Sequence, residues 1–112
     1  MKQPNDRVLL LDMLDHARLA VAAADGRTRA DLDADPVLAA ALERFVEVIG
    51  EAATKVSQSV RDGMSEIPWR EIIGMRNRLI HGYAAVDRDI IWTVVTEDLP
   101  SLIASLQSSL DT

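Results

Sequence analysis

The stretch that decides the fold is DPVLAAALERFVEVIGEAATKV, residues 35–56. Asp35 followed by Pro36 is a strong helix start, because an acidic residue caps the free amide groups and proline suits the first helical position. Apolar side chains then recur in steps of four and three, at Leu38, Leu42, Phe45, Ile49, Ala52 and Val56. This spacing predicts a helix that runs to about Val60 and is either central to a bundle or shared with a second subunit.

A second helical pattern precedes this stretch. Residues 6–24 carry apolar side chains at helical spacing, so they predict a first helix with Asn5 or Asp6 as its N-cap. The charged segment 25–35 breaks the pattern and predicts a surface loop with a short turn around Leu32.

Further helices are predicted after residue 60. Pro68 opens a helix that Gly82 is expected to end, and Asp87 is a good N-cap for the next one. Pro100 either kinks this last helix or separates it from a fifth. No segment shows the alternation typical of a strand. The whole chain, residues 1–112, therefore predicts one all-α domain, a four- to five-helix bundle.

The composition excludes several classes of protein. The chain has no cysteine and two histidines, which excludes disulfide scaffolds and zinc–thiolate sites and argues against a histidine-rich metal site. No apolar run approaches about 18 residues, and the N-terminus lacks a signal-peptide pattern, so we expect a cytoplasmic protein with no membrane partner. The net charge of −6 argues against non-specific binding along DNA.

The residues best suited to chemistry gather in MRNRLIHGY, residues 75–83. From Arg70 to Tyr83 there are three arginines and one acid, so this window of an acidic chain carries a local charge of +2. Arg78 and His81 are i,i+3 neighbours on a helix, whereas Arg76 lies about 140° from His81 on an ideal helical wheel. Two interpretations stay open. The basic residues offset the helix dipole before a glycine cap, or guanidinium groups and an imidazole form an anion site that moves protons.

The run RNRLIHGY, residues 76–83, resembles the Arg-x4-His-x-Tyr motif of the HepT-like toxins, which belong to the HEPN superfamily of small all-α proteins. The flanking segments are also similar to that family: VIGEAATKVS (48–57), IPWREIIGMRNRLIHGY (67–83) and DIIWTVVTEDLPSLI (89–103). The resemblance covers about residues 36–110, and the first 35 residues match by helix pattern only.

The resemblance implies a homodimeric, metal-independent endoribonuclease of HEPN type that needs no cofactor. It implies that Arg76 and His81 form the catalytic pair in a cleft at the dimer two-fold axis, where Asn77 helps to orient them. Arg78 is an extra cation, to which we assign phosphate attraction only. The family's toxins pair with an MntA-like nucleotidyltransferase antitoxin, which silences the toxin by adenylylating the motif tyrosine, here Tyr83.

The chemistry of RNA is consistent with such a site. The 2′-hydroxyl of RNA is its own nucleophile, so cleavage needs a base, an acid and cations. One chain offers one suitable histidine, whereas two chains around a two-fold axis offer two. Because DNA lacks the 2′-hydroxyl, we do not expect it to be cleaved.

Two alternatives of other classes stay open. One is a non-catalytic helical subunit that binds and regulates a nucleotidyltransferase, for which Arg76 and Arg78 would sense nucleotide. The other is a purely structural dimerisation module, which leaves the clustered Arg, His and Tyr unexplained. An intact Arg76–His81 pair favours the enzyme.

Structural roles account better for the other notable residues. His16, and the i,i+4 acids Glu43, Glu47 and Glu51, are expected to be solvated rather than metal ligands. The two tryptophans, Trp69 and Trp92, are expected to anchor the core or an interface. Two glycines inside helices, Gly50 and Gly74, suggest close helix approach.

Overall fold

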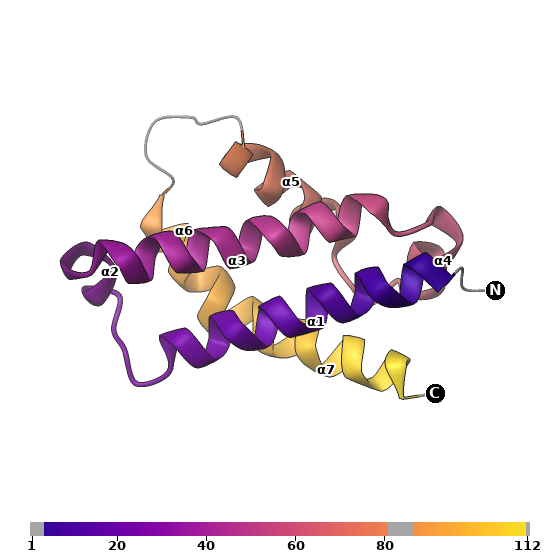
Figure 1. Cartoon of the computed structure of the whole chain (residues 1–112), viewed down its shortest axis with the longest axis horizontal. Helices are drawn as coiled ribbons and strands as arrows, with labels where there is room; N and C mark the ends of the chain where they lie inside the picture. Colours follow the sequence, from indigo (N-terminus) through magenta and orange to yellow (C-terminus); the bar gives the residue numbers. More distant parts are fainter. Residues whose placement is uncertain (1–3, 81–86, 112) are drawn as a thin grey trace.

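The computed structural model describes residues 4–80 and 87–111, and all structural statements concern these residues. His81, Gly82 and Tyr83, which carry part of the motif, lie outside them. Throughout the described ranges the structured elements are helices and none is a strand, which confirms the all-α prediction (Figure 1). The elements are α1 (Pro4–Ala24), α2 (Asp31–Ala34), α3 (Pro36–Lys55), α4 (Gln58–Gly63), α5 (Trp69–Ile80), α6 (Arg88–Thr93), the π-helix η1 (Val94–Asp98) and α7 (Leu99–Leu110).

Helix α3 is the centre of the bundle. It packs along α1 on one side and against α5 on the other, while α7 packs against α1 (Figure 1). The largest fully buried side chains come mainly from α1, α2, α3, α6 and α7; they include Leu10, Met13, Leu32, Leu42, Ile49, Ile91 and Leu106. Each such side chain contributes about 1.5–3 kcal/mol by leaving water. Among the described helices, none is both long enough and apolar enough to span a bilayer.

The predicted helix start at Asp35 is confirmed. Its carboxylate accepts hydrogen bonds from the amides of Val37 and Leu38, each at 3.1 Å. All side chains of the predicted apolar seam are buried except Phe45, which is half-buried. The neighbouring helices of the same chain cover this seam, so α3 is central to the bundle and a dimer would have to use another surface.

The predicted end of that helix at about Val60 is wrong. Helix α3 ends at Lys55, Val56 is extended, and a separate helix α4 begins after Ser57. The Ser57 hydroxyl accepts a hydrogen bond from the amide of Val60, so its side chain caps α4.

The predicted N-cap role of Asn5 or Asp6 on the first helix is also wrong, because α1 already begins at Pro4. Asp6 is 2% exposed, and its carboxylate accepts hydrogen bonds from the amide and the hydroxyl of Ser57, at 2.8 and 2.9 Å. This buried carboxylate therefore joins the first turn of α1 to the α3–α4 junction, 51 residues away.

The C-terminal helices form a nearly continuous rod. Asp87 caps α6 by accepting a hydrogen bond from the amide of Asp89 at 2.8 Å, as predicted. Pro100 lies in the first turn of α7, so the prediction of a separate last helix at this proline is confirmed. A π-helical turn precedes it, in which the amide of Leu99 bonds to the carbonyl of Val94, five residues back. Because proline lacks an N–H group, one ordinary helical hydrogen bond is missing here, and the wider turn accommodates the loss.

Replacing Asp6 with Ala should destabilise the fold by about 2 kcal/mol, because two hydrogen bonds to a buried carboxylate disappear. The measurement is urea unfolding followed by far-UV circular dichroism. Asp15→Ala is the matched control, since Asp15 is exposed on the same helix and its loss should change stability by less than about 0.5 kcal/mol. Equal stabilities of the two variants would contradict the assigned role of Asp6.

Candidate anion site on helix α5

Helix α5 carries the first half of the motif and is anchored at its start. Pro68 precedes its first residue, and the indole of Trp69 donates a hydrogen bond to the carbonyl of Met64 at 3.1 Å. The amide of Ile72 bonds to the carbonyl of Pro68, which closes the first turn. Trp69 thus anchors the helix to the preceding connection, as predicted for a structural tryptophan.

A glycine on α3 determines how Arg76 is placed. Gly50 is buried where α3 crosses α5, and a Cβ atom at this position would clash with the Cβ of Arg76. The same atom would lie 3.1 Å from the carbonyl oxygen of Ile72. Only glycine lets the two backbones approach this closely, so the aliphatic part of the Arg76 side chain packs directly against α3 at Gly50.

The guanidinium of Arg76 has an unsatisfied donor. Its Nη1 donates a hydrogen bond to the side-chain oxygen of Asn77 at 3.0 Å. Its Nε is buried and has no hydrogen-bond partner among the described residues. A buried donor without a partner costs about 1–3 kcal/mol, so such a group signals an interaction that the described residues do not supply. A guanidinium fork suits a phosphate or carboxylate.

Arg78 does not join this site within the protomer. On a helix, two residues turn through about 200°, so Arg78 lies on the face of α5 opposite Arg76. Arg78 is exposed, whereas Arg76 is half-buried against α3. Gly74 also lies away from α3, and a Cβ there would meet nothing within 4 Å. The structure therefore brings Arg76 and Asn77 together and separates Arg78 from them; His81 and Tyr83 lie outside the described residues.

Ion pairs hold the start of α6, the element that follows the motif. Arg29 pairs with Asp33 and Asp89, and Arg88 pairs with Asp33 at 3.2 Å. The hydrogen bond from Arg88 is the largest cause that lowers the pKa of Asp33, followed by the bond from Arg29. A carboxylate with a lowered pKa stays ionised at neutral pH, so the cluster ties α2 and the turn before it to the start of α6. Periodicity could not reveal these contacts, because they join residues 55 and 60 positions apart.

The other candidate ligands do not form a metal site. In the described parts of the chain, no group of three or more His, Asp or Glu side chains is placed to hold a metal ion. Glu47 pairs with Arg44 on the same helix. The Nδ1 atom of His16 lies 2.8 Å from the carbonyl oxygen of Asp12, and its ring faces Phe45 with centroids 6.3 Å apart.

The fold and this site define a class: a small helical protein with a locally cationic helix, on which the Nε of one arginine has no partner among the described residues. The family model "Ribonuclease HepT-like" matches residues 13–109, and the chain belongs to this family. The match begins inside α1 and so extends beyond the segment from residue 36 for which the motif and its flanks show resemblance.

Individual relatives agree with the family assignment. "Putative RNase TTE0752" of Caldanaerobacter subterraneus subsp. tengcongensis is 37% identical over 102 residues, which are 91% of this chain and 89% of that protein. "Probable ribonuclease HepT" of Thermococcus cleftensis is 45% identical over 62 residues, 55% of this chain and 56% of that protein. "Putative RNase MJ0127" of Methanocaldococcus jannaschii is 26% identical over 107 residues, 96% and 88% of the two chains. No solved structure matches the chain.

A pair of glycine substitutions tests the crossing of α3 and α5. Gly50→Ala should destabilise the protein by about 1–3 kcal/mol, because the added methyl group forces the helices apart at Arg76. Gly74→Ala should stabilise it by up to about 1 kcal/mol, since the methyl group meets open space and alanine is the better helix former. Thermal and urea unfolding measure both changes, and a Gly50→Ala protein as stable as wild type would contradict the close crossing.

Proposed function

We propose that this chain is a metal-independent endoribonuclease whose active site is shared between the two subunits of a homodimer. The observation that carries the proposal is Arg76: it is seated on Gly50, bonded to Asn77, and keeps a buried Nε donor without a partner among the described residues. A scissile phosphate is the anion that an arginine of a ribonuclease would bind. Membership of the HepT-like ribonuclease family supports the same function.

The proposed reaction uses the nucleophile that RNA carries. The 2′-oxygen attacks the adjacent phosphorus as a base removes its proton, and the bond from phosphorus to the 5′-oxygen breaks as an acid protonates that oxygen. His81 of one subunit and His81 of the other would supply base and acid. Arg76 would stabilise the negative charge that builds up on the phosphoryl oxygens.

The polar neighbours of Arg76 would have auxiliary roles. Asn77 accepts a hydrogen bond from Nη1 of Arg76, which restrains the guanidinium and leaves its other donors for phosphate. Arg78 is exposed on the opposite face of α5, so within one subunit it would attract RNA rather than contact the scissile group.

The proposal includes a biological partner. The resemblance to HepT-like toxins supports a toxin that pairs with an MntA-like nucleotidyltransferase antitoxin in the cytoplasm. Transfer of AMP from ATP to the Tyr83 hydroxyl, with pyrophosphate as the leaving group, would place a phosphodiester anion two residues from His81. That group would block RNA and compete for Arg76 through charge-assisted hydrogen bonds.

Cleavage of a fluorescent RNA tests the enzyme. Arg76→Ala and His81→Ala should each lower the rate at least about 100-fold, because one loses charge stabilisation and the other loses proton transfer. EDTA should leave the wild-type rate unchanged, and the same sequence made as DNA should not be cleaved.

The matched control is Arg18→Ala, which removes an exposed arginine from α1 and should retain the wild-type rate. Circular dichroism of every variant shows whether the fold is kept. Loss of activity with EDTA would refute metal independence. A folded His81→Ala variant with full activity would refute the catalytic role of His81, whereas a folded wild-type protein that cleaves no RNA would favour the non-catalytic binding subunit.

Intact-mass analysis tests the proposed switch. After incubation with the partner nucleotidyltransferase, ATP and Mg²⁺, the wild-type chain should gain one or more AMP units and lose ribonuclease activity. Tyr83→Phe should cleave RNA at the wild-type rate and gain no AMP, because the substitution removes the acceptor oxygen and little volume. An equal mass gain on both proteins would refute Tyr83 as the acceptor.

A further inference from the structure

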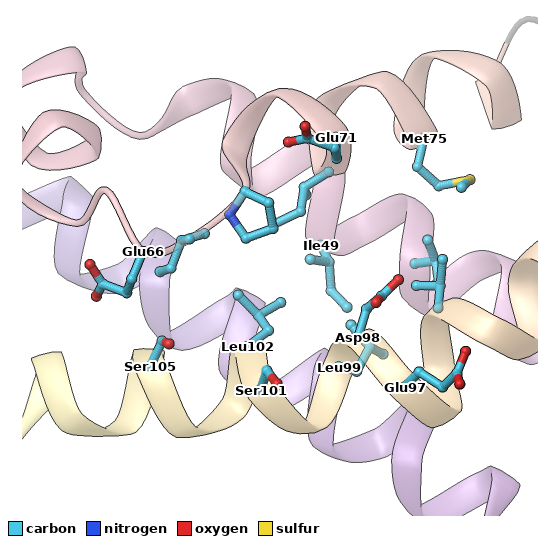
Figure 2. A pocket seen from close by; sticks show the side chains of 15 residues that line it. Ile49, Glu66, Glu71, Met75, Glu97, Asp98, Leu99, Ser101, Leu102 and Ser105 are labelled. Atoms are coloured by element: carbon cyan, nitrogen blue, oxygen red, sulfur yellow. The ribbon is translucent and has the colours of Figure 1, made fainter.

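An open groove lies between α5 and the rod that η1 and α7 form. It has a volume of about 390 Å³, which is within the usual range of ligand sites in proteins (Figure 2). The groove arises because α5 packs on α3, whereas η1 and α7 pack on α1, so the surface between these outer elements stays open.

The floor of the groove is apolar, and α3, α5 and the rod all contribute to it. Its apolar side chains include Val46, Ile49, Ile72, Met75, Leu99 and Leu102. Those from α3 and α7 are buried, whereas Ile72 and Met75 of α5 are only half-buried and leave apolar surface open to another molecule. Methionine adapts its shape to different apolar partners, so Met75 suits such a contact.

Carboxylates border this floor on both sides. Glu66 and Glu71 lie on the side of α5, and Glu97 and Asp98 lie on the side of η1 (Figure 2). All four are exposed, and none forms an ion pair with another described residue. The described residues that line the groove include no arginine, lysine or histidine, so nothing within the groove balances these acids.

Elsewhere the chain neutralises acids that lie close together. Around α2, for example, Asp33 and Asp89 both pair with Arg29. The acids around the groove lack such a partner within the described chain. A second molecule that carries cations would supply it.

An amphipathic helix with basic flanks fits this arrangement. A helix that docks in a groove places apolar residues at i, i+3, i+4 and i+7 on the floor, and the residues on either side of that stripe meet the two walls. Both walls carry carboxylates here. Lysine or arginine on both sides of the stripe would therefore complement the groove, whereas acidic flanks would be repelled.

We propose that this groove binds a basic amphipathic helix of another protein. The apolar stripe of that helix lies on the floor, and its lysines or arginines pair with Glu71 on one wall and with Glu97 and Asp98 on the other. The proposal does not rest on the proposed ribonuclease reaction, because these carboxylates have no part in that site.

Fluorescence anisotropy with three labelled peptides tests the proposal on the wild-type chain. The probe is a synthetic helix of about four turns, with leucine at the stripe positions and lysine elsewhere. One control peptide has the same composition in scrambled order, and the other has glutamate in place of lysine. The probe should bind at least about tenfold more tightly than either control, because only the probe presents the stripe and the flanking cations together.

Charge variants separate the groove from general attraction to an acidic chain. Glu97→Gln combined with Asp98→Asn should weaken binding of the probe about fivefold, because one wall loses its ion pairs. The matched control combines Asp15→Asn with Asp25→Asn, which removes the same charge from exposed positions outside the groove and should leave binding unchanged.

A bulky substitution tests the groove without changing its charge. Ser101 is exposed on α7 and lines the groove (Figure 2). Ser101→Trp should weaken binding of the probe at least about tenfold, because the indole takes the space of the apolar stripe. Ser108→Trp is the matched control, since Ser108 is exposed on the same helix outside the groove. Circular dichroism shows whether each variant keeps the fold.

Each outcome supports or overturns the proposal. Tight binding of the probe that Ser101→Trp removes and that the Glu97 and Asp98 substitutions weaken would support it. If the scrambled peptide binds equally well, or if Ser101→Trp binds as wild type does, the attraction is to the acidic chain in general and the groove is not the site. If no peptide binds, as when a second copy of the chain covers the groove, the proposal is overturned. All these measurements record peptide binding, so the proposed ribonuclease activity stands or falls on its own tests.

Discussion

The contact between Gly50 and Arg76 is the constraint on which the site depends. Because Gly50 has no side chain, the backbones of α3 and α5 approach closely where they cross. The Cβ and Cγ atoms of Arg76 therefore pack directly against the backbone of the central helix. The guanidinium is then held at the edge of the bundle with one donor buried and unsatisfied among the described residues. The close crossing of the two helices and the placement of the anion-binding guanidinium therefore depend on the same two residues, Gly50 and Arg76.

Helix α5 is attached to the bundle differently from the others. Helices α1, α3 and α7 share a common core, whereas α5 packs mainly on α3. A helix that buries one side has its remaining sides free for charge, and α5 uses them for Arg70 and Arg78. Across the groove, η1 carries Glu97 and Asp98, so opposite charges lie on two different elements of the protomer.

Local rules in the sequence determined most of the fold. The Asp35–Pro36 start, the cap at Asp87 and the helix opened by Pro68 were all predictable, because capping and proline geometry depend on neighbouring residues. The apolar spacing of residues 38–56 also predicted the buried face of the central helix, since helical periodicity is local. The motif indicated the family, and the family match confirms it.

Only the tertiary structure decided which partners meet across the chain. Asp6 looked like a local cap, yet it bonds to Ser57, just beyond the end of the central helix, which lies earlier than periodicity predicts. Helical spacing puts Arg76 and Arg78 on opposite faces of α5, but only the packing shows that the Arg76 face meets α3 and that Arg78 is exposed. The role of Gly50 also depended on what crosses it. Spacing along the sequence determines which residues share a helix face, whereas only packing determines what that face meets.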